Sequence, residues 1–253
     1  DYNINMCMTI HVDDLDMIGR VSWLSWAHDL VEKRFGSIKR QVLPFTHTGM
    51  QYERLPNGAL RVTQNSHLNN IKQAPLPEGN LKDSDNLDSK SQHDYTSLLS
   101  SMLWDCQCRL DLMSEVVMLQ AFNKQATVSH LKQANALLRR GQKDNGMLGL
   151  YYPKLGFPLK IVDITDAGHA TKKTSYAQEG MLTLLMQDKS LQVDNSDFVI
   201  NPHDIGGQSH FLCGHGRRSK RLSQSTSHAE TLSKLNGIGN AQLIACLLYT
   251  SDA

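Results

Sequence analysis

The alternation of residue types near the amino terminus most constrains the fold. Apolar residues occupy every second position of residues 4–12, with polar or small residues between them. A period of two is typical of a strand with one buried face. A second short apolar run, residues 15–18, ends at Gly19. The two runs predict a β-hairpin whose turn carries two adjacent carboxylates, Asp13 and Asp14.

Two further segments have clear local signals. From Ser22 to Phe35 apolar residues recur at helical spacing, and Gly36 follows where a helix commonly ends. We expect an amphipathic helix here, with Trp23 and Trp26 as core anchors on its apolar face. The dipeptide Asn57-Gly58 lies between two short strand-like runs and predicts a second hairpin with a type I′ turn.

The middle of the chain contains a linker-like segment followed by two helical stretches. Residues 75–94 collect proline, glycine, aspartate and serine, a composition typical of a linker. Two helical stretches follow at about 95–123 and 128–140, the second with Thr127 as N-cap and Gly141 as its stop. They predict a helical hairpin.

Short strand-like runs dominate after Gly156. They cover residues 159–164, 181–186 and 209–213, and a helical stretch at about 228–247 follows. This order predicts a second α+β domain.

Composition narrows the class of protein. A chain of 253 residues with a net charge of +1 is long enough for a real core and is not a globally basic nucleic-acid binder. The five cysteines form no C-x-x-C pair, which favours a reducing compartment such as cytoplasm or nucleus. The longest apolar runs are far shorter than the ~20 residues that cross a bilayer, so we expect no membrane partner.

The first family resemblance lies at the predicted turn. The segment from His11 to Leu15, His-Val-Asp-Asp-Leu, resembles the Tyr-x-Asp-Asp hairpin of reverse transcriptases. Adjacent carboxylates suit phosphoryl transfer, because two Mg²⁺ ions need hard oxygen ligands close together. The alternative for Asp13 and Asp14 is a solvated turn without chemistry.

Segments further along resemble copia-type retrotransposon polyproteins in one order. They are residues 45–49, 52–54, 57–58 and 62–64 after the hairpin, residues 94–99, 109–111 and 126–132 in the helical region, and residues 166–170, 175–176 and 225–230 near the carboxyl end. The last group is similar to parts of the family's ribonuclease H domain. Leu110 stands where the family has proline, His11 where it has an aromatic residue, and His228 where it has an acidic one.

The resemblance implies site residues and ligands. Asp13 and Asp14 would hold Mg²⁺ for nucleotide addition, and Asp166 and Glu230 would hold Mg²⁺ for hydrolysis of RNA. The implied partners are an RNA template, deoxynucleotides and an RNA:DNA hybrid, in cytoplasmic virus-like particles or the nucleus. A basic loop would contact hybrid phosphates; it comprises Arg217, Arg218, Lys220 and Arg221. A solvated loop or a nuclear-import-like patch is the alternative for this run.

The resemblance also implies an α+β domain plan. Residues 1–74 would be the end of a reverse transcriptase palm and the start of a thumb, 75–94 a linker and 95–150 a helical connection. Residues 151–245 would form a partial ribonuclease H-like mixed sheet with one helix. We interpret residues 246–253 as a translated sequencing-library adaptor, with an ordinary helix end as the alternative.

Both implied catalytic sites lack a carboxylate. A palm needs another one on a strand well before the hairpin, and a ribonuclease H needs another Asp after its first helix. We therefore expect a fragment of a polyprotein that is inactive by itself, since two-metal catalysis depends on a full ligand set. The alternative is a non-catalytic nucleic-acid-binding or interaction protein derived from a domesticated element.

Overall fold

The computed structural model describes residues 5–11, 14–143, 148–168, 176–188, 207–223 and 225–250. These residues form six helices and three antiparallel sheets, which confirms the predicted α+β class. The chain divides into two compact units. One comprises Asp1–Val42 with Asn240–Ala253, and the other comprises Leu43–Gly239.

The first unit begins with the predicted hairpin. Strand β1, Met6–His11, pairs antiparallel with β2, Asp14–Gly19. The register runs from Met6 opposite Gly19 to His11 opposite Asp14. The hairpin prediction is therefore confirmed, and its turn falls between His11 and Asp14.

Helix α1, Val21–Phe35, is also confirmed, and Gly36 ends it with a φ of 90° that favours glycine. The prediction that Trp23 and Trp26 anchor a core is wrong. Their residues are 42% and 54% exposed, and their rings meet edge to face at 5.6 Å. Ala27 is the one buried residue of α1, because a two-stranded hairpin offers too little apolar surface to cover the helix.

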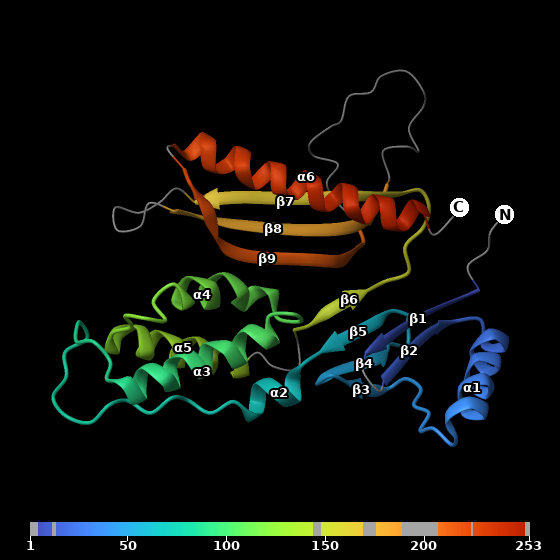
Figure 1. Cartoon of the computed structure of the whole chain (residues 1–253), viewed down its shortest axis with the longest axis horizontal. Helices are drawn as coiled ribbons and strands as arrows, with labels where there is room; N and C mark the ends of the chain where they lie inside the picture. Colours follow the sequence, from blue (N-terminus) through green and yellow to red (C-terminus); the bar gives the residue numbers. More distant parts are fainter. Residues whose placement is uncertain are drawn as a thin grey trace. The chain divides into compact units, whose positions relative to one another are not determined.

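The second unit opens with a four-stranded sheet in the order β3-β4-β5-β6 (Figure 1). Its strands are β3 Phe45–His47, β4 Met50–Arg54, β5 Leu60–Thr63 and β6 Leu150–Tyr152. The hairpin predicted around Asn57-Gly58 is confirmed, since β4 pairs with β5.

The turn type predicted for that hairpin is wrong. Asn57 lacks the positive φ of a type I′ turn, and Leu55 pairs with Ala59 around a three-residue loop that ends in Gly58 with φ 83°. A proline at the first loop position favours this geometry. The two residues with successive positive φ are instead Thr48 and Gly49, between β3 and β4.

Four helices follow and form the main core. Leucines and other apolar side chains from all four are buried in one cluster. The helices are α2 Asn65–Asn70, α3 Ser89–Asp105, α4 Leu110–Gln120 and α5 Val128–Lys143. The single helix predicted at 95–123 is wrong: a turn at residues 106–109 divides it, where Asp105 O accepts hydrogen bonds from the backbone N–H groups of Cys108 and Arg109.

Helix α5 begins where predicted, but Gly141 does not end it. Gly141 is buried inside the helix, and a Cβ there would lie 3.0 Å from Leu112 Cδ1. Glycine at this position therefore serves close packing of α5 on α4. The segment predicted as a linker packs on the start of α5 through backbone bonds from Val128 N to Asp85 O and from Ser129 N to Asp83 O, both 3.0 Å.

The third sheet has the order β7-β8-β9, and the part of α6 up to Gly239 lies along one face of it (Figure 1). The elements are β7 Leu159–Gly168, β8 Tyr176–Gln187, β9 Ser209–Leu222 and α6 Thr226–Thr250. All three predicted strands are present and longer than predicted, and the helix matches closely. The described strands pair antiparallel throughout, so the predicted mixed sheet is not what these residues form.

Candidate functional site

The first predicted carboxylate pair lies at the tip of the β1–β2 hairpin. Asp14 is exposed, begins β2 and pairs across the hairpin with His11. Asp13 lies outside the described residues. The sequence predicts a hairpin with Asp14 at its turn, and Asp14 is the first residue of the second strand.

The second predicted pair, Asp166 on β7 and Glu230 on α6, is connected through one intervening contact. Ser233 Oγ, on the turn of α6 after Glu230, donates to the backbone carbonyl of Asp166 at 3.1 Å. Both carboxylate residues are exposed.

Their side chains leave the sheet in different directions. A Cβ at Gly237 of α6 would meet the side chains of Asp163 and Thr165, so these residues are on the helix face of β7. Because side chains alternate along a strand, Asp166 points to the opposite face. Asp166 therefore contacts α6 through its backbone carbonyl, while its carboxylate lies on the other face of the sheet.

Two other acidic residues do face α6, and sequence reasoning missed both. Glu179 on β8 is buried and accepts from Arg217 Nε and from Asn236 Nδ2, each at 3.3 Å. Asp163 accepts from the Thr183 hydroxyl. Its other oxygen is buried and has no hydrogen-bond partner among the described residues.

A histidine on β9 belongs to the same polar layer. Burial lowers the pKa of His215, and the nearby Arg217 lowers it further, while the charges of Glu179 and Asp163 oppose this shift. The layer therefore joins a buried acid, Glu179, to half-buried acid and base groups on the sheet and to the exposed amide of Asn236 on α6. Its interactions attach α6 to the sheet.

The predicted basic loop is part of a strand. Residues 217–221 lie within β9, so alternation sends Arg217 and Arg218 to opposite faces. Arg217 binds the buried Glu179, and Arg218 is exposed. The side chains of Lys220 and Arg221 lie outside what the structure describes. The prediction of a loop is therefore wrong, and these two arginines do not form one patch.

Three general features of the described residues bear on the site. No group of three or more His, Cys, Asp or Glu side chains in that part of the chain is arranged to hold a metal ion. None of its helices is long and apolar enough to cross a membrane. All five cysteines are free thiols.

A second polar cluster lies in the helical core, and the sequence did not suggest it. Asp105, at the end of α3, is fully buried, and its carboxylate oxygens lie 3.0 and 3.1 Å from His67 Nδ1. Burial raises the pKa of Asp105, although His67 and Arg109 both act to lower it. A histidine beside a buried carboxylate has its Nδ1–H directed at that acceptor, so Nε2 remains for other partners.

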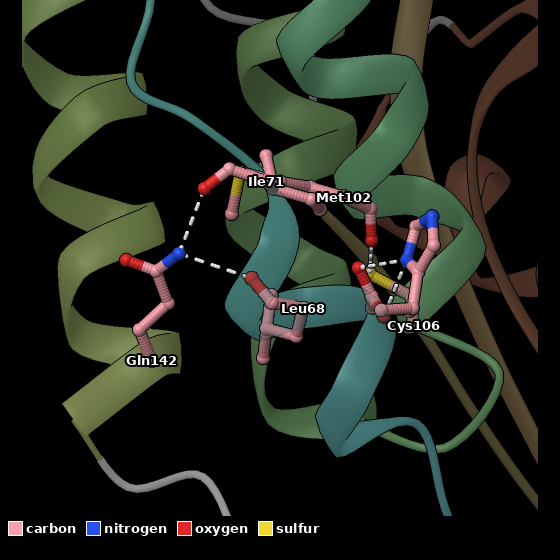
Figure 2. A network of polar contacts seen from close by, with 7 residues as sticks. Leu68, Ile71, Met102, Cys106 and Gln142 are labelled. Atoms are coloured by element: carbon pink, nitrogen blue, oxygen red, sulfur yellow. Dashed lines mark hydrogen bonds and ion pairs between the residues drawn. The ribbon is translucent and has the colours of Figure 1, made fainter.

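The short helix α2 is attached to the same core at its end (Figure 2). The amide of Gln142, on α5, donates to the backbone carbonyls of Leu68 and Ile71 at 3.0 and 2.9 Å. Nearby, the Cys106 thiol donates to the Met102 carbonyl at 3.3 Å. The two bonds from Gln142 attach the end of α2, the helix that carries His67, to α5.

Comparisons of the chain with models of known protein families, with curated proteins and with solved structures found no match.

Proposed function

We propose that this chain is part of a copia-type retrotransposon polyprotein whose parent copies RNA into DNA and hydrolyses the RNA of RNA:DNA hybrids with Mg²⁺. The observation that carries the proposal is the hairpin β1–β2, in which His11 pairs with Asp14, so that Asp14 begins the second strand beside the turn. Asp14 is exposed there, and Asp13, its neighbour in the sequence, would complete the pair of hard oxygen ligands that two Mg²⁺ ions require.

The order of elements at the carboxyl end supports the same proposal. Three antiparallel strands precede one long helix, with Asp166 near the end of the first strand and Glu230 in the first turns of the helix. This order of elements supports the ribonuclease H resemblance of these segments, whereas the direction of Asp166, away from α6, does not. The residues that would hold Mg²⁺ for hydrolysis are Asp166 and Glu230.

We further propose that the chain by itself catalyses neither reaction at a useful rate. Asp166 and Glu230 are exposed, and Asp166 faces away from the helix that carries Glu230. Two-metal catalysis needs carboxylates that converge on shared ions, and a loose or incomplete set loses most of the rate.

A primer-extension and hybrid-cleavage assay tests this proposal. The purified chain is incubated with Mg²⁺, deoxynucleotides and a DNA primer on an RNA template, beside an Asp13→Asn, Asp14→Asn variant. We expect no extension and no cleavage by either protein. Extension by the unaltered chain that the double variant abolishes would show that the chain carries a working polymerase site.

The second candidate function is non-catalytic binding of nucleic acid by a domesticated element. The exposed Arg218 on β9 favours it, because a single cation on a strand contacts phosphate without any metal. The variant Asp166→Asn, Glu230→Gln separates the two functions. Unchanged hybrid affinity and Mg²⁺ response in this variant support simple binding, whereas loss of the Mg²⁺ response supports a metal site.

A further inference from the structure

A hollow of about 390 Å³ lies between α3 and the segment that runs from α2 to Pro75. Buried Leu98 and half-buried Ile71 supply apolar surface to its wall. The polar lining is richer. It includes His67, Lys72, Gln73, Asp94, Ser97 and Ser101.

One wall of the hollow is built around an oriented imidazole. His67 Nδ1 contacts both carboxylate oxygens of Asp105, which is fully buried. Burying a carboxylate to fix a side chain that is 38% exposed is costly and contributes little to stability. The arrangement does fix the ring of His67, which lines the hollow, and it leaves Nε2 without a contact to Asp105.

Lys72 lines the hollow together with that histidine. Lys72 has no ion-pair partner among the described residues, so its ammonium is available to a ligand. Arg139 Nη1 donates to Gln73 Oε1 at 2.8 Å. The NH₂ group of the same Gln73 amide is a further donor.

Hydroxyl groups complete the lining on α3. Ser97 and Ser101 are one helical turn apart, and Asp105 follows one turn later on the same face. The two hydroxyls, the Gln73 amide and the Lys72 ammonium make the hollow rich in donors. Asp94 is the one carboxylate among its lining residues, and it offers an acceptor.

We propose that this hollow is a binding site for a phosphate group. A tetrahedral oxyanion accepts several hydrogen bonds at once, and Lys72 supplies the charge that favours it. Asp94 would accept a bond from a hydroxyl of an attached sugar, while Ile71 and Leu98 would contact its carbon skeleton. The site is separate from the carboxylates of the proposed polymerase and nuclease function and does not depend on them.

Nuclear magnetic resonance titrations with ribose 5-phosphate, inorganic phosphate and ribose test the proposal at constant ionic strength. We expect saturable shifts of the Ser97 and Ser101 amide signals with ribose 5-phosphate and none with ribose. Equal affinity for inorganic phosphate would identify free phosphate as the ligand, and weaker affinity would identify a phosphomonoester. Absence of saturable shifts with both phosphate compounds at millimolar concentration would overturn the proposal.

Matched lysine variants test the assignment to this hollow. Lys72→Met should weaken binding about tenfold, because a charge-assisted hydrogen bond is lost. Lys124→Met removes an exposed lysine outside the lining and should leave the affinity unchanged. Equal effects of the two substitutions would show diffuse attraction of anions by the surface and would overturn the site.

Discussion

The guanidinium of Arg109 forms a bidentate pair with the carboxylate of Asp111, two residues away, with both nitrogen–oxygen distances at 2.9 Å. Arg109 is only 2% exposed, and its third contact, from Nη1 to the Gly141 carbonyl at 2.8 Å, reaches α5. A buried cation at the start of α4 thus joins two helices of the core. Its charge is balanced chiefly by one carboxylate.

Asp111→Ala leaves this buried cation without its carboxylate. We expect a loss of about 2 kcal/mol in the free energy of unfolding, less than for a fully buried pair, because the Asp111 side chain is 43% exposed. Urea denaturation measures the loss. Glu115→Ala, which removes an exposed pair with Arg140 from the same helix, should cost less than about 1 kcal/mol. Equal losses would contradict the role of Arg109.

The same pair has a defined pH dependence. The hydrogen bonds from Arg109 hold the pKa of Asp111 below its ordinary value of 3.8. As pH falls, the unfolded chain therefore binds a proton at Asp111 before the folded chain does. The contribution of the Arg109–Asp111 pair to the free energy of unfolding is full above pH 3.8, and it is lost as pH falls through the lower pKa of the folded chain. In the variant Asp111→Asn, the free energy of unfolding should lack this loss at acid pH. The same dependence of unfolding on pH in the variant and the unaltered chain would argue against the lowered pKa of Asp111.

Asp105 has the opposite dependence. Burial raises its pKa above 3.8, so the folded chain keeps the proton longer than the unfolded chain. Protonation of Asp105 therefore contributes to the free energy of unfolding at low pH. This contribution is lost as pH rises from 3.8 through the raised pKa of the folded chain. Asp105→Asn cannot lose a proton, so its unfolding free energy should fall less over this range. Parallel curves for the variant and the unaltered chain would contradict a buried, titrating Asp105.

Local periodicity predicted the elements well, since alternation or helical spacing marked most strands and helices. It failed where contacts between residues distant in the sequence determine where a helix ends. The predicted helix at 95–123 breaks after Asp105, whose buried side chain contacts His67, 38 positions earlier, and whose carbonyl closes the turn before α4. Gly141 has the local signature of a helix end, yet its packing on Leu112 keeps it inside α5.

The site predictions reached a similar limit. Adjacent acids and basic runs are visible in a sequence, and the turn beside Asp14 followed from them. Buried charges are not visible, because charged residues are ordinarily exposed. Nothing in the sequence around Glu179 or Arg109 marks them as buried. Glu179 meets Arg217, 38 positions later, only through the fold, and Arg109 needs the Gly141 carbonyl of α5 as well as its near neighbour Asp111.

Gly237 on α6 tests how closely that helix approaches the sheet. A methyl group at this position would overlap the Asp163 carboxylate and lie 2.5 Å from Thr165 Cγ2. Gly237→Ala should therefore destabilise the chain by about 1–3 kcal/mol despite the higher helix propensity of alanine. Gly239→Ala, where nothing lies within 4 Å, should stabilise by up to about 1 kcal/mol. Stabilisation by both substitutions would show that the helix is not held this close.

Asn135 on α5 tests the attachment of the segment after α2. Its buried amide accepts from Ala74 N at 2.9 Å and donates to Ala74 O at 2.8 Å. Asn135→Asp replaces the donor with a buried charge that faces a carbonyl, and we expect a loss of about 3 kcal/mol at neutral pH. Gln133→Glu, at an exposed position of the same helix, should change stability by less than about 0.5 kcal/mol. A similarly small change in stability for both variants would contradict the two hydrogen bonds between Asn135 and Ala74.

Thiol labelling tests the burial of the α3–α4 turn. Burial raises the pKa of Cys106 to about 12 and that of Cys108 to about 11, so neither forms the reactive thiolate near neutral pH. The exposed Cys7 and Cys246 should react first with a thiol reagent in the folded chain. Mass spectrometry of the labelled peptides identifies the order, and early labelling of Cys106 or Cys108 would contradict their burial.

The central claim, that the chain is part of a retrotransposon polyprotein, is tested most directly by sequencing the source transcript through both ends of this chain. The account predicts an open reading frame that continues on both sides. It should add a carboxylate-bearing strand upstream and a further aspartate downstream, and other residues should replace residues 246–253. A start codon just before Asp1 and a stop codon after Ala253 would contradict it, and the binding function would then be the better account.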